Sequence, residues 1–313
     1  MSQSDRPSVQ FFTVESNQDG QRLDNFLLSR LKGVPKSLLY RLIRKGEIRV
    51  NKGRVKPERK LVSGEVVRVA PIRTAQPGEA VVPSQQLQAL LRDAILYDDT
   101  EMMVVDKPAG LAVHGGSGIS LGAIEALRSM FPHERGLELV HRLDRDTSGC
   151  LLLAKKRAVL KKLQQQIQHK DTRKRYLALV KGKWPKGKTE VNAPLLKNQL
   201  SSGERVVRTD AAGKASLTLF EVVQTFAEAT LVGATLMSGR THQIRVHAQC
   251  AGHPLAGDEK YGDADFNAYI RNLGGKRMFL HAAELAIVHP VSGEPMTFEA
   301  PLPAELAQLL EKL

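Results

Sequence analysis

The sequence predicts an α+β fold divided into two domains, and three observations lead to this prediction. With 313 residues the chain is longer than one typical domain and can bury a large core. Apolar periodicity stops at residues 74–86, where proline, glycine and glutamine gather, so we expect a linker there. After the linker, helical and extended patterns are mixed without regular β-α-β alternation. That order favours a mostly antiparallel sheet over a doubly wound parallel sheet.

Residues 18–82 are expected to form the smaller domain. Leucines recur at helical spacing in RLDNFLLSRL and in SLLYRLIRK, so we predict two short helices, with Ser37 as the N-cap of the second and Gly46 as its end. The stretches EIRVNKGRVKP and GEVVRVAP then alternate apolar and polar residues, as half-buried strands do, around the turn residues Asn51 and Gly53. The first part of the chain therefore reads as two helices followed by a small set of strands.

Residues 92–313 are expected to form the larger domain. Its elements, in order, are a hairpin in AILYDDTEMMVVDK, a helix in SLGAIEALRSMF, a buried central strand in CLLLAKK, a helix in AVLKKLQQQIQHK, a strand in RKRYLALVKGKW and a helix in THQIRVHAQCAG. The last helix is predicted to be capped by Thr241 and ended by Gly252.

The charge of the chain points to a polyanionic partner. The formal net charge is +13, and residues 36–60 carry ten basic residues against two glutamates, a net of +8. Charge concentrated in this way favours a phosphate-binding face over general solubility. No apolar run approaches the roughly 18 residues of a membrane span, the N-terminus lacks the order of a secretory signal, and Cys150 and Cys250 are interpreted as small buried residues. A cytoplasmic protein without membrane contact is expected.

The sequence contains no motif for a metal site, a nucleotide-binding loop or a kinase catalytic loop. The nine histidines form neither HxH nor HExxH, and GGSG at 115–118 is not followed by Lys-Ser/Thr. We therefore predict neither a metal nor a cofactor. HRLD at 141–144 differs in order from the kinase HRDL loop, and no DFG follows.

The stretch HRLDRDTSGCLLLAKK places two carboxylates directly before the predicted buried strand. A loop held by a rigid strand is a common place for a catalytic group, so Asp144 is a candidate, although a structural carboxylate that binds loop amides explains its position equally well. Asp146 precedes Thr147 and Ser148 and is interpreted as a turn-former whose carboxylate binds their backbone.

Five motifs taken together resemble one enzyme family. VVDKPAGLAVHGG, HRLDRDTSG, RKRYLALVKG, SGRTHQIRVHAQCAGHP and RMFLHAAEL occur in the order found in the RluA family of pseudouridine synthases, and residues 22–69 resemble the S4 RNA-binding domain. Where that domain usually has Asn-Gly in its hairpin, this chain has Asn51, Lys52 and Gly53, so a turn one residue longer is expected. The resemblance implies a long mixed sheet with a central active-site cleft and an N-terminal S4 domain.

The resemblance also implies site residues and their roles. Asp144 matches the essential aspartate, which adds to the base, attacks C1′ or removes the 2′ proton; these three routes stay open. Each route needs an ionised carboxylate. A carboxylate near apolar groups stays ionised only beside a cation, and Arg245 matches the arginine that has this role in the family. Tyr176 matches the tyrosine that stacks on uracil and takes the C5 proton. The candidates for substrate binding are Arg142, which would enter the space left by the flipped base, together with His141, Arg240, His242 and Leu280.

The implied activity is the conversion of uridines to pseudouridine in large-subunit ribosomal RNA or its precursor particle, without cofactor. No extra apolar surface is evident in the sequence, so we expect a monomer. The residues expected to contact RNA in the S4 region are Arg41, Arg44, Lys45, Arg49, Lys52 and Arg54. Two alternatives remain. One is a catalytically idle RNA-binding or ribosome assembly factor, although such a protein would be free to lose Asp144, Tyr176 or Arg245. The other is a glycosylase, which normally needs a second carboxylate and a route for water.

Overall fold

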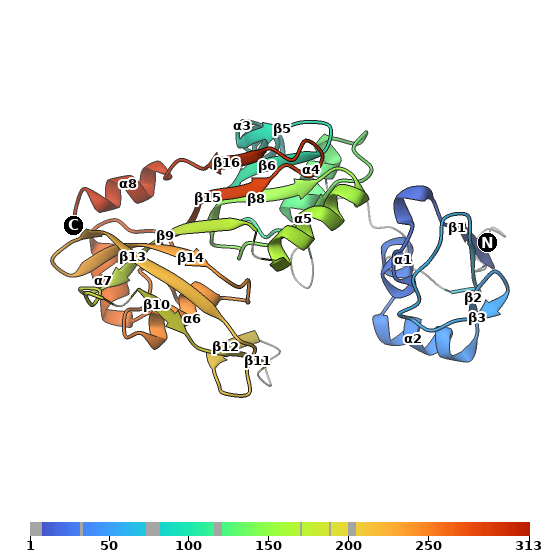
Figure 1. Ribbon diagram of the computed structural model, residues 1–313, viewed down its shortest axis with the longest axis horizontal. Helices are drawn as coiled ribbons and strands as arrows, with labels where there is room; N and C mark the ends of the chain where they lie inside the picture. Colours follow the sequence, from blue (N-terminus) through green and yellow to red (C-terminus); the bar gives the residue numbers. More distant parts are fainter. Residues whose placement is uncertain are drawn as a thin grey trace, which may run out of the picture. The chain divides into compact units, whose positions relative to one another are not determined.

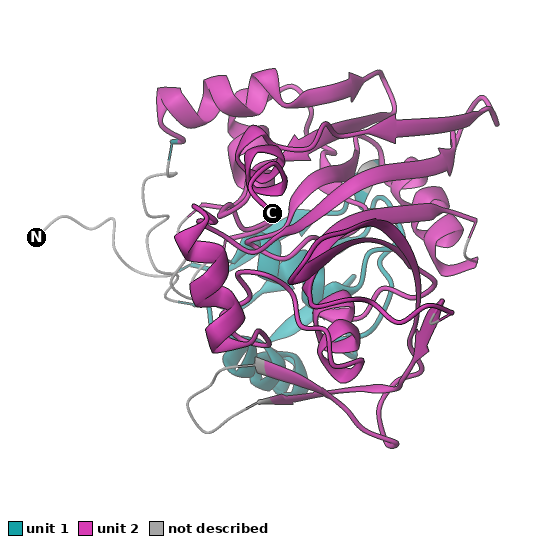
Figure 2. Ribbon diagram, turned by 90° about the vertical axis from the view of Figure 1, so that its left-hand side faces the viewer, with its two compact units in different colours: residues 1–82 teal, residues 83–313 magenta. Residues whose placement is uncertain are grey.

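The computed structural model describes residues 8–31, 34–72, 82–115, 121–169, 171–187, 189–199 and 205–313. The chain divides into two compact units, residues 1–82 and 83–313, which are coloured separately in Figure 2. Each unit has its own hydrophobic core and is described by itself. The predicted GGSG stretch lies largely outside the described residues, as do residues 74–81 of the predicted linker.

The smaller unit packs two helices on a four-stranded antiparallel sheet. Its elements are β1 (Gln10–Thr13), a 3-10 turn (Ser16–Gln18), α1 (Leu23–Arg30), α2 (Lys36–Lys45), β2 (Ile48–Val50), β3 (Gly53–Arg54) and β4 (Val66–Val69), with the strand order β1-β4-β2-β3. Phe26, Leu39 and Ile48 are fully buried in its core. The two predicted helices are confirmed. Strand β1 was not predicted and begins before residue 18, so the compact unit is longer than the predicted domain.

Two local predictions in this unit are wrong, and both concern the ends of elements. Helix α2 begins at Lys36 with Pro35 at the N-cap position, so Ser37 lies inside the helix; Gly46 ends it in the left-handed conformation, as predicted. The β2–β3 hairpin has a two-residue turn, because Val50 pairs directly with Gly53. Asn51 and Lys52 both have positive φ, 46° and 68°, which is the pattern of a tight hairpin turn. The turn is thus no longer than a usual Asn-Gly turn.

Lys52 is expected to be strained in this turn. A lysine with φ of 68° brings its Cβ close to the following carbonyl, whereas glycine adopts this conformation without penalty. We expect Lys52→Gly to stabilise the hairpin by about 0.5–1 kcal/mol. Hydrogen exchange of the β2 amides in the full chain measures this change, and faster exchange in the variant would contradict the assigned turn.

The larger unit is built on one ten-stranded sheet. Its strands are β5 (Ile95–Asp98), β6 (Met102–Lys107), β7 (Glu138–Leu139), β8 (Ser148–Ala154), β9 (Arg173–Lys181), β10 (Glu190–Asn192), β13 (Leu217–Thr225), β14 (Ala229–Leu236), β15 (Leu280–Val288) and β16 (Pro295–Glu299). The main path runs β10-β13-β14-β9-β15-β8-β6-β5, with β16 beside β15 and β7 beside β8 (Figure 1). Every pairing is antiparallel except that of β15 with β8. The predicted α+β class and mostly antiparallel sheet are confirmed.

Helices cover both faces of this sheet because its strands bury side chains on both faces. The helices are α3 (Gln85–Asp93), α4 (Ala123–Met130), α5 (Arg157–His169), α6 (Gln243–Cys250), α7 (Ala264–Asn272) and α8 (Ala304–Leu310). Side chains of α3, α4 and α6 share one hydrophobic cluster with Leu151 and Leu153 of β8. Leu152 of the same strand packs with α5 on the opposite face. Strand β8 is therefore buried along its whole length, as its apolar run predicts.

Helix α3 corrects the predicted linker and the predicted start of the larger domain. Residues 85 and 86 were placed in the linker, but they form the first turn of α3, whose N-cap Ser84 accepts a hydrogen bond from the Leu87 backbone N–H. Leu91 is fully buried against the sheet. Since α3 packs on the larger core, that unit extends upstream of residue 92. Cys250 is a further correction, since it is exposed, whereas Cys150 is buried as predicted.

Candidate active site

One cavity brings together the residues that the sequence singles out in the larger unit. It has a volume of about 230 Å³ and opens beside the loop that precedes β8. All eight candidates for catalysis or substrate binding line it: Asp144, Tyr176, Arg245, Arg142, His141, Arg240, His242 and Leu280. They come from four separate segments of the chain, so their convergence follows from the fold and not from nearness in sequence.

Asp144 lies in the loop between β7 and β8, where the buried strand anchors it. The loop turns tightly, because the backbone N–H of Thr147 donates to the backbone carbonyl of Asp144 at 3.2 Å. The carboxylate of Asp146 does not close this turn as predicted; it forms an ion pair with Arg145 at 3.1 Å. The structure therefore separates the two carboxylates, since Asp144 faces the cavity beside Arg245 and Asp146 pairs with its exposed neighbour.

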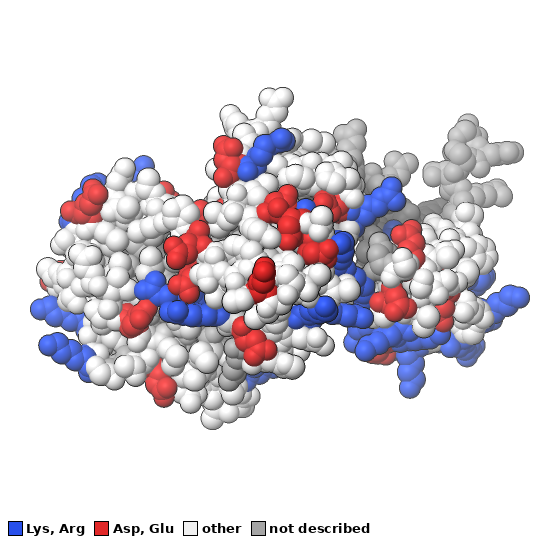
Figure 3. All heavy atoms as spheres, turned by 45° about the horizontal axis from the view of Figure 1, so that its top comes forward, with Lys and Arg blue, Asp and Glu red and all other residues white. Residues whose placement is uncertain are grey.

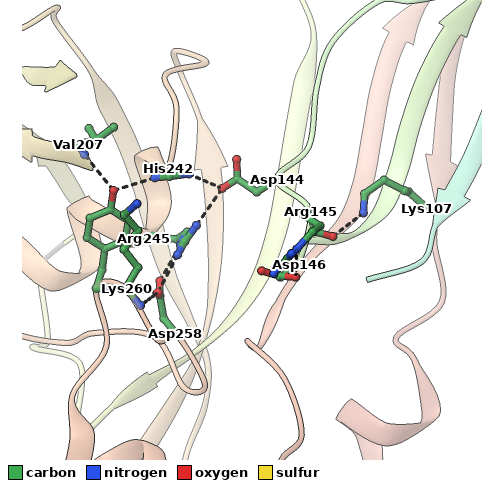
Figure 4. Close-up of polar contacts among 10 residues, drawn as sticks. Lys107, Asp144, Arg145, Asp146, Val207, His242, Arg245, Asp258 and Lys260 are labelled. Atoms are coloured by element: carbon green, nitrogen blue, oxygen red, sulfur yellow. Dashed lines mark hydrogen bonds and ion pairs between the residues drawn. The ribbon is translucent and has the colours of Figure 1, made fainter. Parts of the chain in front are cut away.

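Lys107 supports the same loop from inside the protein. Its side chain is fully buried, and its ammonium group donates to the carbonyls of Pro108, Leu111 and Arg145 at 2.7, 2.8 and 3.0 Å. The last of these bonds holds the residue that follows Asp144 (Figure 4). Burial is the main cause that lowers the pKa of Lys107 to about 7.

Replacing Lys107 should destabilise the larger unit. Lys107→Met removes the donor that the carbonyls of Pro108, Leu111 and Arg145 share, and of these the Arg145 carbonyl keeps a bond from the Gly110 backbone N–H. We expect the free energy of unfolding to fall by about 2–4 kcal/mol. The single tryptophan, Trp184, is buried in this unit, so urea denaturation followed by its fluorescence reports this change. An unchanged midpoint would show that the three hydrogen bonds do not hold the loop.

The same residue predicts a dependence of stability on pH. The pKa of Lys107 is lowered from 10.5 to about 7, so between these values the unfolded chain binds a proton that the folded chain has released. Stability therefore rises with pH across this window. The difference in unfolding free energy between wild type and Lys107→Met should widen from pH 7 to pH 10, whereas a constant difference would contradict the lowered pKa.

Arg245 faces two carboxylates and binds them unequally. Its Nε and Nη2 atoms donate to Asp258 Oδ2 and Oδ1 at 2.7 and 2.8 Å, while Nη1 lies 3.4 Å from Asp144 Oδ2 (Figure 4). The Asp258 side chain has no exposed surface, whereas that of Asp144 is 18% exposed. Arg245 is thus fixed by Asp258, and it places positive charge beside Asp144 without binding that carboxylate tightly.

His242 is the second group that faces Asp144. Its Nε2 lies 3.9 Å from Asp144 Oδ2, and its Nδ1 lies 2.7 Å from the hydroxyl of Tyr261. His242, not Thr241, occupies the N-cap position of α6, with φ of 54°. Histidine adopts this left-handed conformation more often than most residues. The prediction of Thr241 as the cap is therefore wrong, while Gly252, with φ of 86°, ends the helix as predicted.

Gln243 explains how the loop before α6 keeps its shape. Its side-chain oxygen accepts from the Ser238 hydroxyl and the Arg240 backbone N–H, at 2.8 and 3.1 Å. Its amide nitrogen donates to Leu217 O and to Thr218 Oγ1, both at 2.9 Å. One buried amide thus ties the loop that carries Arg240 and His242 to strand β13.

The floor of the cavity is mostly apolar and aromatic. Tyr176 on β9 and Leu280 at the start of β15 are both almost fully buried. Burial, followed by the charge of Asp144, raises the pKa of Tyr176. The phenol therefore stays protonated, so it offers an aromatic face and a neutral hydroxyl and is poorly suited to take the C5 proton as a phenolate.

Cations line the rest of the cavity. Arg142 and Arg240 are exposed at its mouth, and Lys174 is a buried cation on β9. Burial lowers the pKa of Lys174. His141 accepts a hydrogen bond from the Leu152 backbone N–H at 3.1 Å, and burial, with the nearby charge of Lys174, lowers its pKa to about 4. His141 is thus neutral and orders the loop.

Three functional candidates were missed from the sequence: Lys174, Asp258 and Tyr261. Asp258 and Tyr261 lie in GDEKYG at 257–262, which reads locally as a polar turn. The bracketing glycines are a usable signal, because a Cβ at Gly257 would lie 2.3 Å from the Arg277 carbonyl oxygen. That close approach fixes the turn against the rest of the unit.

In the described part of the chain, no group of three or more His, Cys, Asp or Glu side chains is arranged to hold a metal ion. Nor is any described helix long and apolar enough to cross a membrane.

Comparison with known proteins places this site in a family. A model of the RNA pseudouridylate synthase family matches residues 101–250, which include Asp144, Tyr176 and Arg245, and a model of the S4 domain matches residues 21–67. The chain is 53% identical over 313 residues to a protein from Escherichia coli (strain K12) named ribosomal large subunit pseudouridine synthase C, covering 99% of this chain and 98% of the relative. The chain belongs to the RNA pseudouridylate synthase family. The relative of the same name from Haemophilus influenzae is 52% identical over 308 residues, covering 98% of this chain and 95% of that one.

Solved structures agree with this membership of the pseudouridylate synthase family. Human RNA pseudouridylate synthase domain containing 4 has a TM-score of 0.60 at 25% identity and covers 72% of this chain and 95% of its own. Human RNA pseudouridylate synthase domain containing 1 has a TM-score of 0.55 at 26% identity, with 73% and 87% covered. The pseudouridine synthase fold expected from the motifs is confirmed.

Proposed function

We propose that this protein converts uridines of large-subunit ribosomal RNA to pseudouridine, with Asp144 as the catalytic carboxylate. The observation that supports this proposal is that Asp144, Arg245 and Tyr176 line the same cavity in a member of the family. The RNA substrate follows from the names of relatives that are about half identical over nearly the whole chain.

The reaction makes demands that this cavity meets. The C1′–N1 bond must break, the uracil must rotate while held, and C5 must bond to C1′ before its proton leaves. The half-buried Asp144 suits all three open routes, because Arg245 places a positive charge 3.4 Å from its carboxylate. Glycosidases usually need two carboxylates because they add water. Here the base is recaptured, so one carboxylate suffices.

The remaining cavity residues have proposed roles in holding the base. Tyr176 stacks on the uracil and allows it to rotate, while Leu280 forms the apolar floor. The target must leave its stack, which costs a few kcal/mol. Arg142 is exposed at the cavity mouth, where its planar guanidinium can fill the vacated space. Arg240, His141 and His242 order the loops around the ribose.

The smaller unit is proposed to bind RNA through the basic residues of α2 and the β2–β3 hairpin. Arg41, Arg44, Lys45, Lys52 and Arg54 are exposed, and Arg49 is half-buried. Figure 3 shows Lys and Arg gathered along one edge of this unit. Arg49 and Arg54 are directly opposite each other on paired strands. Like charges in that arrangement repel, and a bound phosphate would relieve the repulsion.

The proposed function extends to the domain bounds, the partner and the compartment of the protein. We propose residues 18–82, extended upstream by β1, as the RNA-binding domain and residues 92–313, extended by α3, as the catalytic domain. Large-subunit RNA or its precursor particle is the proposed partner. A cytoplasmic monomer that needs no cofactor stays a prediction.

Tritium release tests the proposed activity. Large-subunit RNA transcribed in vitro with tritium at uracil C5 loses the label to water when C5 bonds to C1′. The purified protein should release tritium without added cofactor, at a limited number of sites per transcript. If neither this RNA nor a precursor particle loses tritium, the proposed function fails and an RNA-binding or assembly factor is favoured.

A further inference from the structure

The segment Asp258–Tyr261 contacts two groups that face Asp144, namely Arg245 and His242. Asp258 binds Arg245 through two hydrogen bonds, and the Tyr261 hydroxyl bonds His242 at 2.7 Å. Nitrogen atoms of Arg245 and His242 lie 3.4 and 3.9 Å from Asp144 Oδ2. One short turn therefore contacts both Arg245 and His242.

Asp258 fixes the turn and Arg245 with a single buried carboxylate. Its Oδ1 accepts from the backbone N–H groups of Lys260 and Tyr261 at 2.9 and 3.0 Å, in addition to Arg245 Nη2. These bonds and the Arg245 charge outweigh burial and keep the pKa of Asp258 below its usual value. The bidentate pair occupies two of the three guanidinium nitrogens, so only Nη1 is directed at Asp144.

The Tyr261 hydroxyl and His242 Nδ1 share a hydrogen bond whose donor depends on the histidine tautomer. The Val207 backbone N–H, on strand β12 (Arg205–Thr209), donates to this hydroxyl at 3.0 Å. The hydroxyl can then donate its own proton to His242 Nδ1, which leaves the imidazole proton on Nε2, facing the Asp144 carboxylate. The opposite tautomer would direct a nitrogen lone pair at a carboxylate oxygen, which is repulsive.

We propose that Asp258 and Tyr261 are positioning residues for the isomerisation. Asp258 restrains Arg245 so that it does not form a tight bidentate pair with Asp144, and Tyr261 holds His242 as the Nε2–H tautomer that donates toward Asp144. The carboxylate of Asp144 therefore stays ordered while keeping an oxygen available to react. This inference rests on the function proposed above and adds two residues to its site.

The test compares single-turnover rate constants with dissociation constants for the same RNA. Asp258→Asn removes the anion that holds Arg245. The rate constant should fall on the order of 10²-fold, because a small misplacement of a catalytic group has an effect of this size. The dissociation constant for RNA should change less than about threefold. Tyr261→Phe keeps the ring that lies 4.9 Å from the Arg245 guanidinium carbon and removes only the hydroxyl. Its rate constant should fall about tenfold.

Matched controls come from nearby helix α7. Asp263→Asn removes a carboxylate paired with Lys181 at 2.7 Å and keeps an N-cap residue, and Tyr269→Phe removes a hydroxyl from a ring that stacks on Phe266. Both should keep wild-type rate constants and unfolding midpoints. If Asp258→Asn and Tyr261→Phe also keep wild-type rate constants while wild type is active, the inference fails and the proposed function stands. A wild type that releases no tritium fails the proposed function instead.

Two further measurements keep the inference testable if Asp258→Asn does not fold. The first is a double-mutant cycle with His242→Gly, which suits the positive φ of this position. Tyr261→Phe should have no further effect in that background, whereas an equal effect in both would mean that Tyr261 does not act through His242. The second is the nitrogen chemical shifts of His242 in the wild type. They should report the Nε2–H tautomer, and the Nδ1–H tautomer would overturn the inference.

Discussion

Asp144→Asn should abolish isomerisation and leave RNA binding intact. The amide matches the carboxylate in size but carries no charge, so it cannot act as a nucleophile or a base. We expect the single-turnover rate constant for tritium release to fall at least on the order of 10⁴-fold. The fold should tolerate the change, because Arg245 keeps its bidentate partner Asp258. The dissociation constant for RNA, measured by filter binding, should stay within about threefold of wild type.

The neighbouring carboxylate provides the matched control. Asp146 lies two residues further on and pairs with Arg145 on the exposed side of the loop. Asp146→Asn should therefore retain most of the wild-type rate constant. Tritium release that persists in Asp144→Asn, or that is lost equally in both variants, would contradict the assignment of Asp144. An unchanged urea midpoint, followed by the fluorescence of the buried Trp184, would show that the fold of Asp144→Asn is intact.

Reversing the basic surface of the smaller unit should weaken RNA binding and change its salt dependence. Arg44 and Arg54 are exposed and Arg49 is half-buried; together they lie on α2, β2 and β3. In the triple Glu variant, we expect affinity to fall on the order of 10²-fold at low salt. The slope of log K against log salt should decrease in magnitude by about 2–3, since each phosphate contact contributes about one.

The control for this variant changes the same total charge elsewhere. Lys161, Lys186 and Lys312 are exposed on the larger unit, outside the residues that line the cavity. Reversal of these three should lower affinity less and leave the slope nearly unchanged. Equal effects of the two triple variants would mean that RNA responds to net charge alone, and the proposed role of the hairpin would be wrong.

Local patterns were sufficient to predict the parts of the site that lie on regular elements. The apolar run CLLLA predicts a buried strand, and the structure buries every residue of β8, so the loop that carries Asp144 is anchored as expected. Helical spacing likewise predicts α6, which carries Arg245 into the cavity. The eight candidates came from motifs whose order resembles a family, and the fold brings all of them to one cavity.

Long-range contacts explain most of what sequence reasoning missed. Tyr261 bonds Val207, which is 54 residues away, and Arg245 approaches Asp144 across 101 residues. No local periodicity encodes such pairs, so GDEKYG reads only as a turn. His242 adopts a left-handed conformation beside buried Gln243, whose side chain bonds β13, and a capping rule based on Thr241 does not include such long-range bonds. The positive φ of Lys52 was equally hard to predict, because it follows from the pairing of Val50 with Gly53 and not from the preference of lysine.

The most direct test of the central claim uses RNA labelled twice in its uridines, with tritium at C5 and carbon-14 in the uracil ring. An isomerase breaks the C1′–N1 bond and rebonds the same base through C5. The tritium at C5 is therefore lost, while the carbon-14 of the ring is kept. Wild-type protein should release tritium to water while all carbon-14 stays in the RNA, and the retained base should be pseudouridine. Carbon-14 released as free uracil would identify a glycosylase and contradict the account, as would retention of both labels.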